Sequence, residues 1–452
     1  MPIYNGEKYL CQSMDSILNQ SYVNFELLCI NDCSNDSTGI ILEHYNQRDK
    51  RIRIFYNEKR SGAAVSRNKG ITFSNGKYLI FLDADDIFEN DMLEVAYRYI
   101  EKHNADVVEF SCDSFVGDDY QECNVIRKKN TVMSFYGKVI SILDYPSHII
   151  EWLTMSVWNK LYLKEYIINN EIEFQDIECY NDSYFVFLSL VLTDKYLRIN
   201  TNKCFLHYRQ HNTKDRISTY RNPMCSYQLI NKTQDTLIDK GYWNKLYNHF
   251  YLLMLFVIIS ALKGCKSCED EKKFYDILQK KGINEIFTRG NITYRKIEPY
   301  IESRIKKFMT EPYSSRWWET ETYLTALLYD YPELISKIIK DIKKKNKRIA
   351  IWGYGNDGKI LLDFCHNHFI EIDGIIDRDV NKQGQIINDT RIMSIEKGCE
   401  MTSIIIVSNS NHYQDVKNAL NKIPKKIKVF DIKTCIFEKI LRLVRKRNVE
   451  VV

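Results

Sequence analysis

Short apolar runs alternate with helical patterns through the first 115 residues, and this alternation most constrains how the chain can fold. Residues 25–30 (FELLCI) form a short apolar run of the kind found in strands buried in a parallel sheet. Leu10, Met14 and Ile17 lie at i, i+4 and i+7, which places them on one face of a helix. The pattern continues with predicted strands at 52–56, 78–82 and 107–110 and predicted helices at 62–73 and 92–102. The alternation predicts an α/β fold in which helices cover a parallel sheet.

In the remainder of the chain, the pattern of predicted secondary structure changes twice. Residues 220–340 are helical in pattern, rich in Tyr, Leu, Ile and Lys, and show no clear strands. A charged bridge (IIKDIKKKNKR) then leads into a second, smaller α/β unit. The predicted domains are an N-terminal α/β domain over 1–220, a helical region over 221–345, a small α/β domain over 346–435 and a basic tail over 436–452.

Composition excludes several classes of protein. The chain has 64 Lys and Arg against 59 Asp and Glu, and a net charge of +5 is too small to predict nucleic-acid binding. Its 13 cysteines, an odd number without a regular spacing, predict reduced thiols and a cytoplasmic protein. The longest apolar stretch, residues 251–262, is too short to span a bilayer.

Acidic residues follow two of the predicted strands directly. Asp32 comes after the first of them. Three further acids follow the strand of residues 78–82, namely Asp83, Asp85 and Asp86. Ligands of open α/β sheets bind at the carboxyl ends of strands, and carboxylates crowded there repel one another unless they share a cation. Because Mg²⁺ and Mn²⁺ prefer carboxylate and phosphate oxygens, the pattern favours a metal-held diphosphate, with a polar cap for the helix near Asn90 as the alternative.

Five segments, in this order, resemble a family 2 glycosyltransferase with a GT-A fold, of the inverting, bacterial surface-polysaccharide type. They are residues 2–10, 16–20, 29–37, 62–70 and 78–86. The resemblance covers roughly residues 1–220. It implies a metal-dependent hexosyltransferase that moves a sugar from a nucleotide sugar, a UDP-sugar above all, to a glycan or lipid-linked acceptor in surface polysaccharide biosynthesis.

The resemblance also implies roles for individual residues. The implied donor-binding residues are Pro2, Tyr4, Asp32, Arg67 and Asp83. Asp32 would hold the uracil or other base, Asp83 would bind the ribose, and Arg67 would approach the diphosphate. Asp85 would ligate the cofactor, Mn²⁺ or Mg²⁺.

The chain departs from the family pattern near its start. Asn31 stands where the family usually has Asp, and Cys33 stands where it has Gly, which makes the turn less permissive of positive φ. The family's first apolar strand is missing, because the chain opens at the equivalent of that strand's final proline. We expect this loss to expose the edges of two neighbouring strands. A misplaced start codon or a truncated sequence is one explanation, and a naturally shortened, weakly active protein is the other.

Asp182 precedes an apolar helical pattern and matches the position of the family's general base. The resemblance implies that it takes the proton of the acceptor hydroxyl in a single in-line displacement, with inversion at the anomeric carbon. A helix N-cap is the alternative role, and the two roles can coexist. Asn181 replaces a family Glu and so removes one negative charge.

Two more segments supply candidate site residues. In VWNKLY, Trp158 is a candidate platform for an acceptor sugar and Lys160 a candidate phosphate contact, while a place in the core is the alternative for Trp158. In FLHYR, His207 is a candidate metal ligand as a neutral imidazole, with a histidine satisfied within its strand as the alternative.

The small C-terminal unit has the G-x-G-x-x-G spacing of a dinucleotide site between an apolar strand and a helix. Gly353, Gly355 and Gly358 would let the backbone approach a diphosphate, and Asp377 would meet a ribose. The unit resembles the small Rossmann-like modules attached to sugar-modifying enzymes and sugar O-acetyltransferases. Three interpretations stay open: a nucleotide or nucleotide-sugar site, a packing or oligomerisation module, and a dehydrogenase.

Two other functions therefore compete with sugar transfer. One is an NAD-dependent sugar epimerase or reductase centred on the C-terminal glycines, and the other is a nucleotide-binding protein without catalysis. The tail over 436–452 interleaves basic and apolar residues, which predicts peripheral contact with the inner leaflet of the plasma membrane. A solvated helix packed on the last domain is the alternative for this tail. We expect a cytoplasmic protein that does not bind nucleic acid.

Overall fold

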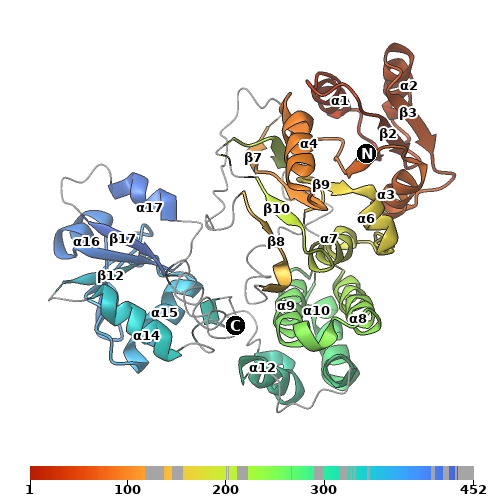
Figure 1. Ribbon diagram of the computed structural model, residues 1–452. Coiled ribbons are helices and arrows are strands. Elements are labelled where there is room, and N and C mark those ends of the chain that lie inside the picture. The colour runs from red at the N-terminus through yellow and green to blue at the C-terminus, as the bar shows by residue number, and fades with distance from the viewer. Residues whose placement is uncertain are drawn as a thin grey trace, which may run out of the picture. The chain divides into compact units, whose positions relative to one another are not determined.

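The computed structural model describes most of the chain. The ranges outside the description are 118–136, 145–155, 200, 202, 211–221, 266, 290–298, 316–323, 326–327, 329–331, 344–346, 409–412, 421–426, 433–434 and 436–452. The basic tail, and with it the predicted membrane contact, therefore lies outside the described residues. The chain divides into two compact units, Met1–Thr293 and Tyr294–Val452, and both combine helices with sheets (Figure 1).

The first unit begins with a small parallel sheet and its helices. The strands are β1 (Pro2–Ile3), β2 (Leu27–Asn31) and β3 (Ile52–Tyr56), and the helices are α1 (Leu10–Leu18), α2 (Thr38–Arg48) and α3 (Gly62–Phe73). The order is β1-β2-β3, with Pro2 beside Ile30 and Leu27 beside Ile52. Every residue of β2 is buried, as its apolar composition predicts. The predicted alternation of strands and helices is confirmed in this segment.

A second sheet of the same unit is mixed rather than parallel. Its order is β4-β9-β6-β10-β8, formed by β4 (Tyr78–Ile80), β9 (Lys160–Leu163), β6 (Val107–Glu109), β10 (Tyr196–Arg198) and β8 (Val139–Ile140). Strand β9 lies between β4 and β6 and is antiparallel to both. The prediction of a purely parallel sheet is therefore wrong here. The prediction failed because β9, the strand between β4 and β6, lies about 50 residues after β6 in the chain. Local alternation of strands and helices does not reveal a pairing over such a distance.

A third, small sheet carries residues that reach the site described below. It has the order β5-β11-β7, formed by β5 (Ile87–Phe88), β11 (Leu206–Gln210) and β7 (Cys112–Val116). Strand β11 runs parallel to β7 and antiparallel to β5. The accompanying helices are α4 (Met92–His103), α6 (Lys164–Asn169) and α7 (Asn181–Val191).

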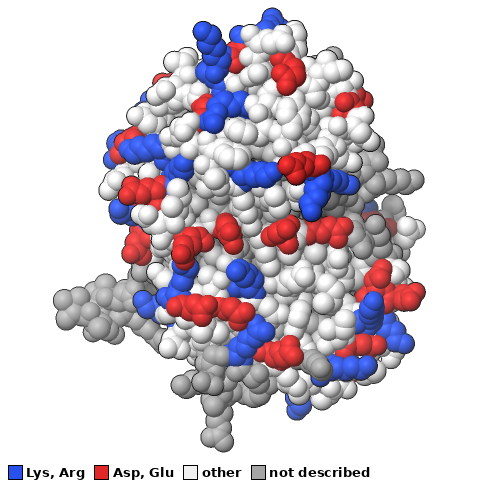
Figure 2. Space-filling view, turned by 90° about the vertical axis from the view of Figure 1, so that its right-hand side faces the viewer, with Lys and Arg blue, Asp and Glu red and all other residues white. Residues whose placement is uncertain are grey.

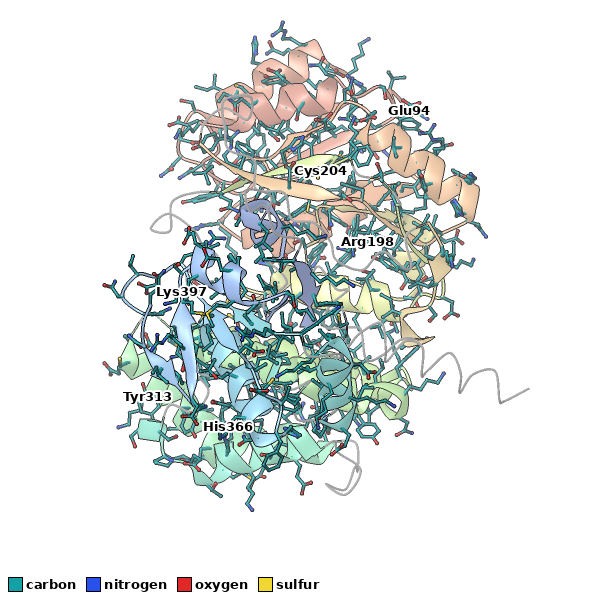
Figure 3. The ribbon with its side chains drawn as sticks, turned by 90° about the vertical axis from the view of Figure 1, so that its left-hand side faces the viewer. Glu94, Arg198, Cys204, Tyr313, His366 and Lys397 are labelled. Atoms are coloured by element: carbon teal, nitrogen blue, oxygen red, sulfur yellow. The ribbon has the colours of Figure 1, made fainter. Side chains whose placement is uncertain are left out.

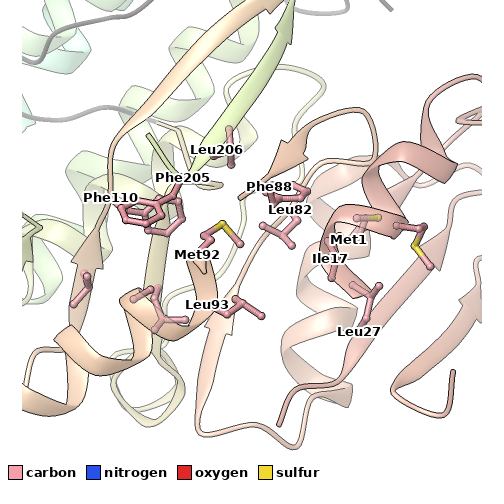
Figure 4. Packing of buried hydrophobic residues seen from close by; sticks show 14 of the residues in the cluster. Met1, Ile17, Leu27, Leu82, Phe88, Met92, Leu93, Phe110, Phe205 and Leu206 are labelled. Carbon is pink, nitrogen blue, oxygen red and sulfur yellow. The ribbon is translucent and has the colours of Figure 1, made fainter. Parts of the chain in front are cut away.

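A buried apolar cluster joins these sheets to α4. Met92 and Leu93 of α4 lie between Phe88 and the aromatic pair Phe110 and Phe205 (Figure 4). The rings of Phe110 and Phe205 meet edge to face at 6.2 Å between centroids, a favourable geometry for aromatic pairs. This packing joins α4 to the neighbouring strands β5 and β11.

Helices complete the first unit. They are α8 (Pro223–Asp239), α9 (Trp243–Lys263), α10 (Cys268–Ile277) and α11 (Ile283–Thr288), with a π-helical segment (Leu278–Gly282) joining the last two. Helix α8 has a typical start, since the Asn222 side chain accepts from the Met224 N–H and Pro223 occupies the first turn. The predicted helical character is confirmed for the described residues. Among these residues, no helix has the length and apolar character needed to cross a bilayer.

The second unit contains one larger sheet. Its order is β14-β15-β13-β12-β16-β17, formed by β12 (Ile349–Trp352), β13 (Gly374–Ile376), β14 (Ile386–Ile387), β15 (Thr390–Met393), β16 (Ile404–Val407) and β17 (Lys428–Asp431). Its helices are α12 (Pro299–Thr310), α14 (Pro332–Ile342), α15 (Asn356–Asn367), α16 (Ile395–Met401) and α17 (Tyr413–Leu420). The central strand β12 is fully buried and parallel to both β13 and β16. A second α/β unit is therefore present.

The charged side chains show no single-sign patch on the face seen in Figure 2, where basic and acidic groups are interspersed. This distribution agrees with the small net charge of the chain. The cysteines that the structure describes form no disulfide, and they range from buried, as for Cys29, to exposed, as for Cys11.

Candidate functional site

A cavity of about 760 Å³ in the first unit brings together three of the predicted site residues, Asp83, Trp158 and Asp182. Its volume lies within the usual range for ligand pockets. The remaining wall comes from β7, β11, α7, α8 and α9, and includes Asp113, Ser114, Tyr208, Thr233, Phe250 and Val257. Residues from distant parts of the chain thus meet in one place.

Arg67 holds two of the elements around this cavity together. Its Nη2 donates to Asp83 Oδ1 at 2.8 Å, and its Nη1 donates to Asn181 Oδ1 at 3.2 Å. The side chain is buried in α3, only 7% exposed. A charge-assisted hydrogen bond of this kind is shorter and stronger than a bond between neutral groups. Arg67 therefore fixes the loop after β4 against the start of α7.

Asp182 lies in the first turn of α7, directly after Asn181. Burial raises the pKa of its carboxyl group, the positive charge of Arg67 opposes this, and the negative charge of Asp83 raises the pKa further. The N-cap of α7 is Tyr180 rather than Asp182. A half-buried carboxylate with a raised pKa has the properties of a general base that works near neutral pH.

The acids after β4 repel one another, as predicted. Asp86 is fully buried, and its Oδ1 accepts from the main-chain N–H of Arg209 at 2.9 Å, while its Oδ2 has no hydrogen-bond partner. Burial raises the pKa of Asp86 well above its usual value, and the charges of Asp85 and Asp83 raise it further. The side chain of Arg209 holds the loop by donating from Nε to the Asp85 carbonyl oxygen at 2.8 Å.

The donor set around this loop fits a hard divalent cation only in part. Carboxylate oxygens are the ligands that Mn²⁺ and Mg²⁺ prefer, and a cation would relieve the repulsion that raises the pKa of Asp86. Among the residues that the structure describes, however, no group of three or more His, Cys, Asp or Glu side chains could hold a metal by itself. A cation here would need additional oxygens from a ligand, as is common for Mg²⁺ on phosphates.

Asp32 is held tightly at the end of β2. Its Oδ1 accepts from Asn57 Nδ2 at 2.6 Å and from Ser61 N at 2.7 Å, and its Oδ2 accepts from Gly62 N at 2.8 Å. The carboxylate therefore ties β2 to the N-terminus of α3, where negative charge is favourable. The neighbouring Cys33 has a φ of 59°, in the left-handed region that favours glycine. Because Cys33 has a Cβ atom, this conformation costs free energy, as its replacement of the family's Gly predicts.

The other two predicted donor residues lie nearby in the sequence. Pro2 belongs to β1 and pairs in register with Ile30. Tyr4 follows this strand, is 38% exposed, and has the guanidinium of Arg60 over its ring at 4.1 Å. Neither residue is among those that line the cavity.

Trp158 forms an aromatic wall of the cavity together with Tyr208. The two rings are stacked, with centroids 5.6 Å apart and an interplanar angle of 10°. Trp158 both packs against the apolar core and lines the cavity. Its predicted place in the core is confirmed in part, and its role as a platform for an acceptor sugar stays a prediction.

The prediction that Lys160 contacts an acceptor phosphate is wrong. Lys160 is fully buried in β9, with its Nζ 3.4 Å from Glu109 Oε2 and donating to the Ser156 carbonyl oxygen at 2.8 Å. Arg198, visible in Figure 3, pairs with the same glutamate at 2.9 Å. The reason is that β9 is an inner strand, so a charged residue on it must find its counter-charge inside the protein.

His207 does not fit the predicted role of metal ligand. Its Nδ1 lies 2.6 Å from Asp113 Oδ1 and its Nε2 lies 3.0 Å from Glu89 Oε1. Both ring nitrogens thus face carboxylates, which leaves neither as a lone-pair ligand for a cation. The alternative interpretation, a histidine satisfied by its surroundings, describes this side chain better.

Sequence reasoning missed Asp113, Tyr208 and the face of α9 that lines the cavity. Asp113 gave no signal, because it follows the predicted strand of residues 107–110 and lies among polar residues. The lining face of α9 gave none either, since residues 251–262 are apolar apart from Ser260 and so show no single apolar face.

The glycine loop of the second unit has the expected local geometry. Gly353 has φ of +86°, and a Cβ on Gly358 would collide with the Gly353 carbonyl oxygen. Asp377 accepts from Tyr354 N at 2.7 Å and from Asp379 N at 2.9 Å. Burial alone would raise the pKa of Asp377, but these N–H groups and Lys382 bring it below its usual value. Binding of a nucleotide to this loop stays a prediction.

Comparison with known proteins identifies the two parts separately. Residues 1–167 match the family model "Glycosyl transferase family 2", and residues 345–430 match the model "C2185-like, N-terminal". The Streptococcus pneumoniae glycosyltransferase GlyA is 24% identical over 78% of this chain and 47% of its own length. The putative teichuronic acid biosynthesis glycosyltransferase TuaG of Bacillus subtilis is 43% identical over 22% of this chain and 39% of its own length.

Among solved structures, residues 1–349 of S. aureus TarS superpose with a TM-score of 0.51 at 17% identity, covering 70% of this chain and 86% of that one. At this identity the likeness concerns the fold. The chain spans less than half of the length of GlyA and of TuaG. The resemblance noted for the N-terminal part is confirmed: residues 1–167 match the family 2 glycosyltransferase model, and TarS has a similar, GT-A-like fold.

Proposed function

We propose that the protein is a metal-dependent, inverting glycosyltransferase that moves a sugar from a UDP-sugar to a glycan or lipid-linked acceptor in the synthesis of a bacterial surface polysaccharide. One observation carries the proposal: Asp83, Asp182 and the Trp158–Tyr208 stack line the same cavity. An acid on the donor side, a base with a raised pKa and an aromatic surface are groups that can serve sugar transfer. The similarity to the glycosyltransferases GlyA and TuaG supports this class of reaction.

The donor would lie along the strand ends of the first unit. Asp32, Asp83 and Arg67 would bind the base, the ribose and the diphosphate, with Pro2 and Tyr4 beside them. A solved complex of TarS residues 1–349 holds UDP-GlcNAc, which supports a UDP-sugar as the donor. In the present arrangement Arg67 is paired with Asp83, so donor binding would exchange part of that ion pair for phosphate contacts.

Asp85, together with diphosphate oxygens, would hold Mn²⁺ or Mg²⁺. When bound, such a cation stabilises the negative charge that develops on the leaving diphosphate. Two residues of this chain shape the place: Arg209 donates to the Asp85 carbonyl oxygen at 2.8 Å, and the buried Asp86 lies next to Asp85, with a raised pKa that a nearby cation would lower.

Asp182 would act on the acceptor. Its carboxylate takes the proton of the acceptor hydroxyl while the oxygen attacks the anomeric carbon, and the bond to the diphosphate breaks on the opposite face. Burial favours this step, because it raises the pKa of Asp182 and so strengthens the base. Trp158 and Tyr208 would hold the acceptor sugar by stacking.

The test is release of UDP from a panel of UDP-sugars, including UDP-GlcNAc, with Mn²⁺, with Mg²⁺ and with a chelator. We expect one donor to be turned over and the chelator to stop it. Parallel absorbance measurements with NAD⁺ and NADH address the epimerase or reductase alternative. Nucleotide binding without UDP release would contradict the proposal and favour a non-catalytic binding protein.

A further inference from the structure

The cavity is lined by two kinds of side chain. The proposed base Asp182, Ser114 and the Trp158–Tyr208 stack supply polar and aromatic groups. Helices α8 and α9 add mainly apolar residues, Leu229 and Val257 among them. These apolar side chains offer no hydrogen bond to a sugar hydroxyl.

Helix α9 supplies most of these apolar residues. Phe250, Leu253, Met254 and Val257 lie at i, i+3, i+4 and i+7, so they form one face of the helix, and all four line the cavity. Leu253 and Val257 are only half-buried. On the opposite face of the helix, Leu255 and Ile259 are buried in the unit.

This face keeps apolar surface in contact with solvent inside a cavity, which costs free energy until an apolar group covers it. This face and Asp182 line the same cavity. One bound molecule can therefore contact both.

We propose that the acceptor is an amphiphile: its sugar lies between Trp158 and Asp182, and an apolar chain attached to that sugar lies on the face of α9 formed by Phe250, Leu253, Met254 and Val257. The proposal rests on the proposed function and narrows its acceptor to the class of glycolipids or alkyl-linked sugars.

The first experiment compares binding of n-octyl and methyl β-D-glucopyranoside by titration calorimetry in the presence of UDP and Mn²⁺, below the concentration at which the octyl compound forms micelles. We expect the octyl compound to bind at least about tenfold more tightly, which is what burial of only two methylene groups supplies. Equal affinity of the two glucosides would overturn the proposal.

The second experiment locates the chain. Val257→Glu places a carboxylate on the apolar face and should abolish the octyl preference, whereas Asn244→Glu, which adds the same charge at an exposed position of the same helix, should keep it. If Val257→Glu does not fold, Val257→Thr keeps the shape, adds one hydroxyl, and should weaken octyl binding several-fold. An octyl preference that survives both Val257 variants would show that the chain binds elsewhere and would overturn the proposal.

Release of UDP from the donor without acceptor is measured on the same proteins. If UDP release persists while octyl binding is absent, the proposed function stands and the amphiphilic acceptor is refuted. If the octyl preference depends on Val257 but no UDP-sugar is turned over, the apolar subsite stands and the proposed transfer is refuted.

Discussion

Acidic side chains near the strand ends of the two α/β units have different surroundings. In the second unit Asp377 accepts main-chain N–H groups of its own loop, and its pKa is lowered. In the first unit Asp32 is held by main-chain N–H groups in the same way, but Asp86, in the loop after β4, and Asp182, in the first turn of α7, have raised pKa values, because burial and neighbouring acids oppose their charge. Burial close to other acids, more than a place at the end of a strand, therefore separates Asp86 and Asp182 from Asp377.

The largest difference between the two units is expected when Asp85 is removed. We expect Asp85→Ala to abolish metal-dependent release of UDP while leaving the fold intact, since the lost cation supplies several kcal/mol of charge stabilisation. UDP release is measured across a Mn²⁺ titration. Asp379→Ala, which removes an exposed acid at the corresponding place in the second unit, is the control and should be fully active. Unchanged activity of Asp85→Ala at every Mn²⁺ concentration would remove Asp85 from the site.

The next largest effect concerns the proposed base. Asp182→Asn keeps the shape of the side chain but cannot take a proton, so we expect transfer to fall by about 10²–10⁴-fold. Donor affinity, measured by calorimetry with UDP, should stay near that of the unchanged protein. Asp377→Asn should leave transfer unaltered. Loss of UDP binding in Asp182→Asn would mark this residue as structural instead.

The pH dependence of the transfer rate is a further test, because it depends on the pKa of Asp182. Because the pKa of Asp182 is raised, its carboxylate is protonated over a wider acidic range, and the rate should climb about tenfold per pH unit below that pKa. Arg67 lowers this pKa, so Arg67→Gln should move the acidic limb of kcat to higher pH. If the acidic limb of the kcat profile does not move in Arg67→Gln, a group other than Asp182 controls the pH dependence.

The smallest effects are on stability, and they should have opposite signs in the two units. The lowered pKa of Asp377 contributes stability that is present at neutral pH and is lost as the pH falls through that pKa. Asp377→Asn should therefore cost about 1–3 kcal/mol at pH 7. The raised pKa of Asp86 makes the ionised form costly as pH rises, so Asp86→Asn should stabilise the metal-free protein by on the order of 1 kcal/mol.

Thermal unfolding at pH 7 and near pH 3, with a chelator present, measures both variants. The two differences from the unchanged protein should shrink toward zero at the lower pH. If Asp86→Asn destabilises the metal-free protein at pH 7, the acids after β4 do not repel one another as described.

Motifs near strand ends allowed much of the site to be predicted. Asp83 and Asp182, 99 positions apart, line one cavity, as their order in the sequence indicated. Lys160 was misassigned because its place on an inner strand depends on pairing with β4 and β6, which no local pattern encodes. Its counter-charge was nevertheless visible, since Glu109 interrupts an apolar strand. The lining face of α9 could not be predicted, because residues 251–262 are apolar apart from Ser260, and such a run does not show which side meets a cavity.

The position of β9 between β4 and β6 also affects when this protein can assemble on the ribosome. About 80 residues separate the end of β4 from the start of β9, which corresponds to roughly 4–16 s of synthesis. For about the last 50 residues of that interval the nascent chain carries both β4 and β6 without the strand that pairs with them. Chains stalled near residue 150 should accordingly be cut rapidly by protease across β4 and β6, and chains stalled well beyond β10 should resist. A chaperone that shields strand edges would therefore act on this sheet before Asp182, the proposed base, has been translated.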